Sequence, residues 1–325
     1  MNAVNTFSPT LRRLSAAAAV ALAVVAPSAT PLAAQAAGKT GVVVVAHGGD
    51  SLWNALVREA AMKAKTEVPV EVSFLMSFGA TQARFQDAVA KLESKGVSRI
   101  VVVPMLVSSH SGHYDQIRYL AGEPIELDKD MAHHLHMAGI EKPKTSLPII
   151  VTPAMDNAPQ VAQVLADRAK ALAPNPKERA LLIVGHGPNS AEDYASWMEN
   201  LRSVADSVKA MTGFRDVRVE LVRDDAPAPV RAEAVKRVRE LIDLQQMATG
   251  KDVIVVPVLV SKGSVSRDKV PADIKGTPSV YSGEPLLPHE AMSRWVELRV
   301  RDAGKTPAKT AEKKAAAAPA HPHDR

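Results

Sequence analysis

The sequence repeats one pattern of strands and turns in its two halves, and this repeat limits the folds open to the chain. The matching segments are 42–48 (VVVVAHG) with 181–187 (LLIVGHG), 101–115 (VVVPMLVSSHSGHYD) with 254–268 (IVVPVLVSKGSVSRD), and 152–159 (TPAMDNAP) with 283–290 (GEPLLPHE). Because the matches follow the same order in both halves, they indicate an internal duplication. A duplicated chain predicts two similar domains that face each other across a cleft.

Apolar strands and amphipathic helices alternate along the first half. Runs rich in Val and Ile predict strands near 41–46, 69–76, 98–106 and 148–152, and helical spacing predicts helices near 50–66, 79–95, 111–121 and 157–174. This alternation is typical of a parallel sheet with crossover helices. The connection over 122–147 is long for the class, and such loops are usually functional or disordered. The sequence therefore predicts an α/β fold with two similar doubly wound parallel-sheet domains.

The two ends of the chain differ in composition from the repeats. Residues 1–37 contain Arg12 and Arg13, an apolar stretch and an Ala-x-Ala site, which together predict a cleaved signal peptide and export to the periplasm by a Sec or twin-arginine route. A membrane anchor is the alternative, but a span needs roughly 20 strongly apolar residues. We expect no stable membrane span after cleavage. The expected domains are 38–175 and 176–303, and 304–325 is expected to be a disordered Ala/Lys/Pro/His tail.

Composition excludes several functional classes. The chain has no cysteine, so a bound metal must be met by histidine, carboxylate or water. The formal charge of +5 comes from scattered Lys and Arg, and aromatic residues make up only 4% of the chain, so we expect no nucleic-acid partner. The sequence also has no phosphate-binding glycine loop of the P-loop type, and no nucleotide cofactor is expected.

Histidines follow two of the expected strands in the first half. His47 and Gly48 come directly after the strand at 41–46, and His113 lies in the loop after the strand at 98–106. Carboxyl ends of parallel strands form the ligand-binding edge of an open α/β sheet, so the two histidines should lie together there. Neutral imidazole binds cobalt, nickel, iron or zinc and titrates near working pH. The pair therefore predicts metal binding and proton transfer.

The second repeat acts as an internal control for the loop histidines. Alignment of the two repeats places Ser266 opposite His113 and Gly263 opposite His110. A histidine that only the fold required should occur in both copies, so its loss in the second copy favours a functional role for His113. His110 is a candidate for either an additional metal ligand or an exposed loop residue.

Two other residues are retained in both copies. His186 matches His47, so the repeat does not separate function from structure there. We favour a structural role for His186, with a place on the far wall of the cleft as the alternative. Asp115 can orient His113 or act as an acid in the first turn of a helix. We favour the second role, because Asp268 persists where the histidine has gone.

The AHG turn at 46–48 and the segment VVPMLVSSHSGHYDQI at 102–117 resemble motifs of the sirohydrochlorin chelatase family, the class II tetrapyrrole metal chelatases. The resemblance extends over 41–302 and is to the long, two-domain form. It implies a lyase of tetrapyrrole biosynthesis, similar to the cobaltochelatases of the cobalamin pathway, that inserts a divalent metal into sirohydrochlorin or a related tetrapyrrole. Cobalt is favoured, with iron or nickel as alternatives. His47 and His113 carry over as the metal-binding and proton-abstracting pair, and Ser266 implies a degenerate second site.

Further candidates surround this pair. The expected substrate-binding residues are Gly48, Ser108, Ser109 and Ser111, although serine-rich loops are mostly solvated turns. The long connection predicts either a polar lid or an auxiliary metal-capture site built from His133, His134 and His136. Because purely biosynthetic enzymes need neither export nor this cluster, an exported, non-catalytic metal or tetrapyrrole carrier is the rival function.

Overall fold

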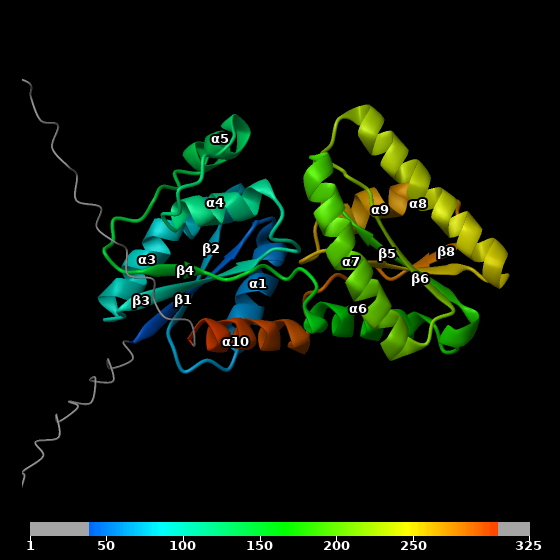
Figure 1. The fold of residues 1–325 in the computed structure, drawn as a ribbon, viewed down its shortest axis with the longest axis horizontal. Helices are drawn as coiled ribbons and strands as arrows, with labels where there is room; N and C mark the ends of the chain where they lie inside the picture. The colour runs from blue at the N-terminus through cyan, green and yellow to red at the C-terminus, as the bar shows by residue number, and fades with distance from the viewer. Residues whose placement is uncertain (1–38, 305–325) are drawn as a thin grey trace, which may run out of the picture. The chain divides into compact units, whose positions relative to one another are not determined.

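The computed structural model describes residues 39–304, which contain two parallel sheets of four strands (Figure 1). The first sheet has the order β2-β1-β3-β4 and consists of β1 (Thr40–Ala46), β2 (Val70–Phe74), β3 (Arg99–Met105) and β4 (Ile149–Val151). The second has the order β6-β5-β7-β8 and consists of β5 (Ala180–Gly185), β6 (Asp216–Leu221), β7 (Val253–Pro257) and β8 (Ser279–Tyr281). The shared order confirms two similar doubly wound domains. The expected signal peptide and nearly all of the expected tail lie outside the described residues.

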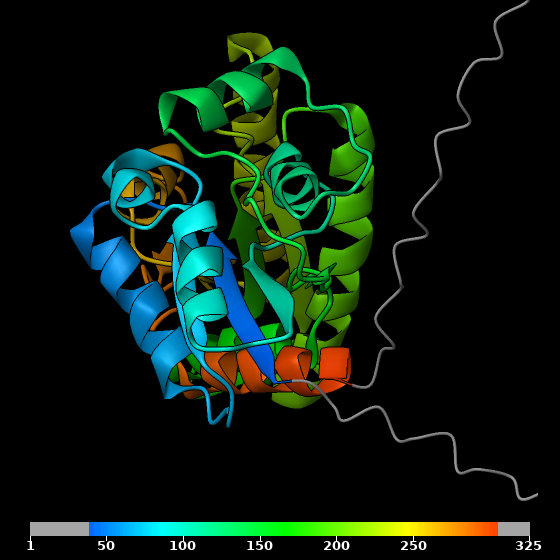
Figure 2. The same cartoon turned by 90° about the vertical axis from the view of Figure 1, so that its left-hand side faces the viewer.

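The central strands are buried on both faces, as their continuous β-branched sequences predict. In β1 the side chains of Val42 to Val45 have no exposed surface, because helices cover both sides of the sheet (Figure 2). β1 pairs in parallel with both β2 and β3, and Ala46 lies opposite Met105 at the end of the ladder. The loops that follow β1 and β3 therefore start side by side at the same edge of the sheet.

Helices fill the connections of the first half largely where the sequence predicted them. They are α1 (Ser51–Lys63), α2 (Ser77–Gln82), α3 (Phe85–Ser94), α4 (Gly112–Leu120), α5 (Lys129–Met137) and α6 (Pro159–Leu172). One helix was expected over 79–95, but the chain breaks at Ala83, whose carbonyl accepts a hydrogen bond from the Phe74 backbone (3.1 Å). The long connection contains α5, which Asp128 caps by accepting a hydrogen bond from Met131 N–H (2.8 Å).

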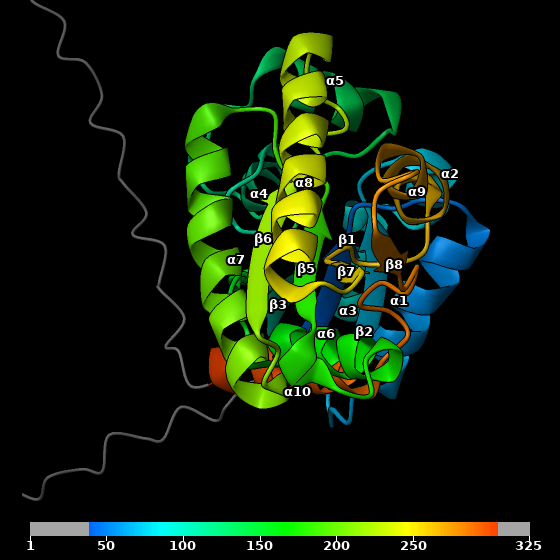
Figure 3. The ribbon, with the colours of Figure 1, turned by 90° about the vertical axis from the view of Figure 1, so that its right-hand side faces the viewer.

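The second half contains longer helices and one irregular segment. Its elements are η1 (Pro176–Glu178), α7 (Ala191–Thr212), α8 (Ala228–Thr249), the π-helix η2 (Val265–Lys269), α9 (Val270–Asp273) and α10 (Glu290–Gly304). Both α7 and α8 pack against β6 (Figure 3). At the position of α4 the second half has η2 and α9 instead, so the loop that carries His113 has a differently folded counterpart.

The two repeats exchange their last helices. The first repeat's α6 packs against α7 and β7 of the second, and α10 packs against α1 and β3 of the first (Figure 1). One hydrophobic cluster accordingly joins residues of both halves, including Leu165, Ile254, Val103 and Trp295. This shared core holds the carboxyl ends of the two sheets in a fixed relation. Within the described part of the chain, no helix is both long and apolar enough to cross a bilayer.

Candidate active site

A cavity of about 960 Å³ is lined by loops from both halves. First-half walls come from the loops after β1 and β3, including 47–50, 106–108 and 111–113. Second-half walls come from the loops after β5, β6 and β7, including 186–190, 224–225 and 263–267. The cavity thus occupies the cleft that the duplication predicted, at the ligand-binding edges of both sheets.

His47 and His113 meet in this cavity. Their ring centroids are 4.6 Å apart and the rings are nearly perpendicular, with an interplanar angle of 86°. The pairing of β1 with β3 explains the contact, because His47 directly follows the last paired residue of β1. Two imidazoles from separate loops therefore lie together at one sheet edge, as the sequence predicted, and the structure shows that they meet edge to face.

Hydrogen bonds fix the tautomers of the two rings. The Nδ1 of His47 lies 2.8 Å from the carbonyl oxygen of Gly48, and the Nδ1 of His113 lies 2.8 Å from Oε1 of Gln116. The amide nitrogen of Gln116 donates to the carbonyl of Met131 (2.7 Å), which leaves its oxygen for His113. Because both partners are acceptors, each Nδ1 carries the hydrogen and each Nε2 keeps a free lone pair.

Burial keeps both rings neutral. Desolvation lowers the pKa of His47, and it lowers the pKa of His113 to about 3, with repulsion from His47 as the next cause. A neutral imidazole binds a metal ion without first losing a proton. The pair is thus prepared to act as metal ligands at neutral pH.

The helix α5 adds one histidine to this pair. The ring of His134 stacks on that of His113, with centroids 6.3 Å apart, and its buried Nδ1 has no hydrogen-bond partner within the described residues. His133 and His136 are exposed instead. The expected capture cluster assumed an irregular loop, whereas a helix rotates each residue by roughly 100° and so directs His134 away from the other two. The structure does not bring the three histidines together.

The loop serines mainly stabilise the loop itself. Ser109 is held by Asp156, which accepts from the Ser109 backbone N–H and hydroxyl, both at 2.7 Å. Ser111 caps α4 with its hydroxyl oxygen, and Ser108 is 2% exposed. Ser108 and Ser111 line the cavity as the sequence-based assignment requires, whereas Ser109 does not line it. The role of Asp156 carried no signal in the sequence.

Gly48 is required by the backbone. Its φ is +97°, and a Cβ at this position would lie 2.4 Å from the carbonyl oxygen of Met76. The absence of a side chain also leaves the cavity wall next to His47 open. This close approach explains why a glycine follows His47 at the end of β1.

His110 is not part of the histidine pair. Its side chain is exposed and does not line the cavity, so the structure favours the exposed-loop interpretation over that of an extra ligand. Its carbonyl oxygen accepts a hydrogen bond from Nε1 of Trp197 (2.7 Å), which connects the two halves beside the cavity. The contribution of His110 is thus through its backbone.

Gln116 is the positioning residue that sequence reasoning missed. Asp115 was considered for this role, but its carboxylate contacts Arg118 (3.3 Å) on the helix surface. Residues three apart share a helix face, so His113 and Gln116 are neighbours while Asp115 points elsewhere. Helical spacing alone therefore contained the signal for Gln116.

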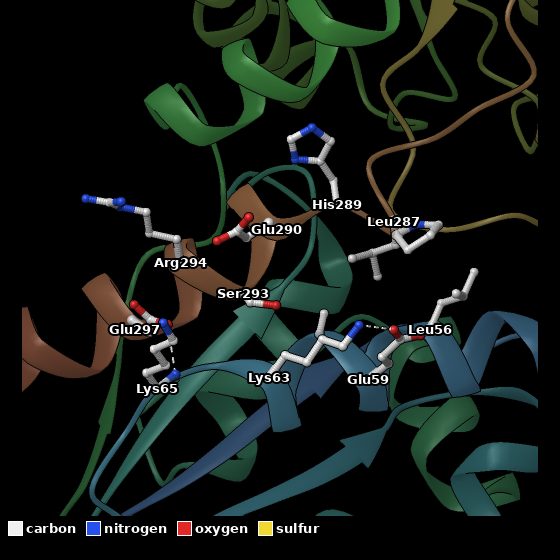
Figure 4. A pocket seen from close by; sticks show the side chains of 12 residues that line it. Leu56, Glu59, Lys63, Lys65, Leu287, His289, Glu290, Ser293, Arg294 and Glu297 are labelled. Atoms are coloured by element: carbon white, nitrogen blue, oxygen red, sulfur yellow. Dashed lines mark hydrogen bonds and ion pairs between the residues drawn. The ribbon is translucent and has the colours of Figure 1, made fainter.

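A second cavity, of about 510 Å³, lies between α1 and α10 (Figure 4). Several of its charged groups already have partners: Lys63 pairs with Glu59 at 2.5 Å, and Glu297 accepts from the Lys65 backbone at 2.8 Å. His289, which lines it, lies 3.4 Å from Asp167. These groups satisfy each other and do not converge on a ligand, so the catalytic candidate is the larger cavity.

Residues 41–172 match the sequence profile of the CbiX family. This half of the chain is a CbiX-family domain. The matched region runs from β1 to α6 and contains both His47 and His113. The resemblance to class II chelatases that the two histidine motifs carried is thereby confirmed.

Solved structures place the CbiX-family domain and its repeat in a chelatase-like fold. SirB from Bacillus subtilis with Fe3+ is 18% identical, with a TM-score of 0.58, and the alignment covers 82% of this chain and 96% of SirB. The sirohydrochlorin chelatase SirB from Bacillus subtilis subspecies spizizenii, in complex with cobalt, is 16% identical over 83% and 97% of the two chains, with a TM-score of 0.55. No curated protein sequence matches the chain.

A multi-domain protein from Deinococcus radiodurans with structural similarity to chelatases also matches. It is 16% identical with a TM-score of 0.51, and the alignment covers 83% of this chain and 56% of that protein. At these identities the three likenesses establish the fold that the CbiX-family domain and its repeat share.

Proposed function

We propose that this protein inserts a divalent metal ion into sirohydrochlorin or a closely related tetrapyrrole in the cavity between its two halves. The observation that carries the proposal is the His47–His113 pair, two neutral imidazoles with free Nε2 lone pairs at a shared sheet edge. Membership of the first half in the CbiX family supports it. So do the SirB structures, which were solved with Fe3+ and with cobalt.

The cavity has the size and lining that a flat, carboxylate-bearing ring requires. Its volume of about 960 Å³ is at the upper end for small-molecule sites. Apolar surface comes from Leu106 and Val107 on one side, Leu259 and Val260 on the other, and Phe78, which is 74% exposed. These residues offer contact area to the faces of a macrocycle, while backbone amides and loop hydroxyls are available to its carboxylates.

The metal ion, as a substrate, would bind the Nε2 atoms of His47 and His113. Imidazole nitrogens suit cobalt, nickel and iron, and the absence of cysteine removes the soft thiolate alternative. We favour Co2+, with Fe2+ or Ni2+ as alternatives. No nucleotide is needed, since insertion exchanges bonds to water and histidine for bonds to the ring nitrogens.

Insertion also requires the ring to lose its two inner N–H protons. Metal–nitrogen bonds form as these protons leave, and each imidazole that gives up the metal has a free Nε2 to accept one. The lowered pKa values of both rings mean that neither holds its proton for long. Asp130 and Asp225 line the same cavity, and their exposed carboxylates can pass the released protons to solvent.

We place this reaction in the periplasm, on the strength of the signal-like residues 1–37. Fractionation of cells that express the full-length chain tests this location. Recovery of an uncleaved chain in the cytoplasm would contradict it, and the active site would be unaffected by that result.

The decisive experiment follows the visible absorbance of metal-free sirohydrochlorin with Co2+ and catalytic amounts of the mature chain. Wild type should convert many equivalents, and His113→Ala should not. His110→Ala is the matched control, because His110 is an exposed histidine of the same loop outside the cavity. If wild type only binds Co2+ or the ring at fixed stoichiometry, without a rate above the uncatalysed reaction, the carrier function replaces the enzyme.

A further inference from the structure

The second half contains a cluster of potential metal ligands opposite the histidine pair. His186 follows β5, and Asp224 and Asp225 follow β6. One ligand atom from each lies within 4.8 Å of the others, and all three residues line the large cavity. Among residues 39–304 this is the group of at least three potential ligands that lies close enough to share an ion. His186 and Asp224 have no role in the proposed chelation, where Asp225 only offers the released protons a path to solvent.

Asp224 shows that the cluster is more than a chance group of surface acids. Its side chain is only 2% exposed, and its Oδ1 has no hydrogen-bond partner in the described structure. That oxygen lies 3.7 Å from Nδ1 of His186. The other oxygen accepts a hydrogen bond from Lys269 (2.8 Å). A buried carboxylate oxygen without a partner is costly, and in native proteins it calls for a ligand, a water or an ion.

We propose that His186, Asp224 and Asp225 form a second binding site for a divalent metal ion, on the cavity wall opposite His47 and His113. Two ligands of one transition-metal ion lie roughly 3 to 4 Å apart, so the group needs only a small contraction. The exposed side chain of Asp225 can supply that movement. The site would satisfy the orphaned oxygen of Asp224.

The donor set selects the class of ion. One imidazole with two carboxylates is a mixed nitrogen and oxygen site, which suits first-row divalent ions such as Mn2+, Fe2+, Co2+ and Zn2+. The histidine pair of the first half offers nitrogen only and therefore favours the later ions. The affinity of the histidine pair divided by that of the second site should therefore rise from Mn2+ to Ni2+. This trend distinguishes the two sites by their chemistry.

Lys269 sets the strength of the second site. Its ammonium group lies 2.8 Å from Asp224 and 3.7 Å from Asp225, so it already neutralises part of the charge that an ion would meet. An incoming cation binds against this repulsion. Removal of the lysine charge should therefore tighten metal binding, whereas removal of the carboxylates should weaken it.

The test measures Co2+ binding by the mature chain without any tetrapyrrole, by calorimetry and by the visible absorbance of the bound ion. In the His47→Ala/His113→Ala background one Co2+ site should remain. The added changes Asp224→Asn and Asp225→Asn should weaken it by roughly tenfold or more. Lys269→Met in the same background should strengthen it. Asp193→Asn, a change in another acid of the cavity wall, is the matched control and should leave binding unchanged.

Two results would overturn the second site. One is a double-histidine variant that binds no Co2+ at millimolar metal while its circular dichroism shows a folded chain. The other is equal binding with and without the two asparagine changes. Since a gain is expected from Lys269→Met and a loss from the asparagines, a general folding defect cannot produce the full pattern. The chelatase proposal is tested by turnover and so fails or stands separately.

Discussion

The two halves share a fold but divide the possible metal ligands between them. Met76 and Arg223 occupy the same position, since each donates its backbone N–H to the carbonyl of the preceding loop's histidine. The next two residues are Ser77 and Phe78 in the first half, but Asp224 and Asp225 in the second. The first half thus has two cavity-lining histidines and no acid at these two positions. The second half has one such histidine and an acid at both positions.

A further pair of equivalent positions extends the contrast. With His113 aligned to Ser266, Gln116 aligns with Lys269. Gln116 holds His113 as a neutral ligand, whereas Lys269 neutralises Asp224. Duplication thus preserved the sheet and its edge, while substitutions at a few loop positions produced one neutral nitrogen site and one charged mixed site. Function is carried by these positions rather than by the fold.

The sharpest test of this contrast changes the equivalent residues His113 and Ser266. His113→Ala should lower turnover by roughly a hundredfold or more, because a metal ligand and proton acceptor is lost. Ser266→Ala removes a hydroxyl that bonds to the Gly263 backbone (3.1 Å), so it should cost about 1 kcal/mol of stability and leave turnover unchanged. Initial rates and urea unfolding of both variants measure these effects. Equal loss of activity would end the claim that the second half is degenerate.

A change at Gln116 should be the next largest. Gln116→Ala frees the His113 ring and breaks the contact with α5 through Met131, so metal affinity should fall by roughly ten- to a hundredfold. The KM for metal should rise more than kcat falls, because the ring remains present but is no longer oriented. Gln116→Glu keeps an acceptor for His113 and should recover part of the affinity. A structural role alone would give no such rescue.

The sequence predicted the sheets, their duplication and the His47–His113 pair because these depend on local patterns. Val and Ile runs define buried strands, and parallel strand ends must share an edge. The exchange of α6 and α10 and the role of Asp156 depend on contacts between distant segments, which have no local signature. The 122–147 segment was expected as a long connection, so the helical rotation that separates His134 from His133 was not foreseen.

Metal binding at the first-half histidine pair should depend little on pH. Because the pKa of His113 is lowered to about 3 and that of His47 is also lowered, Co2+ binding at the pair should change little between pH 7 and pH 5. The same shifts act on stability: both rings fold as neutral groups, so their contribution is full above pH 6.5 and is lost as the pH falls toward the folded-state values.

Unfolding of wild type and His113→Ala at pH 7 and pH 4.5 measures this effect. The loss of stability on acidification should be smaller in the variant, since one buried histidine no longer resists protonation. An identical loss in both proteins would show that the His113 ring is protonated as readily in the folded as in the unfolded chain. The neutral character assigned to the first-half site would then be wrong.

The smallest expected effect is at His134. In the described second half, no helix like α5 places a histidine against a cavity-lining one. The His134 ring stacks on that of His113, so it can reach an ion held by the pair only while α5 keeps this position. His134→Ala should weaken Co2+ binding several-fold, up to roughly tenfold, and lower turnover less.

His133→Ala and His136→Ala are matched controls on the exposed side of α5 and should have no effect. Equal weakening by all three changes, with turnover absent in wild type, would instead support metal capture by α5 and the carrier function. A selective effect of His134 would show that α5 contributes one ligand to the nitrogen site, because only this histidine is directed at the pair.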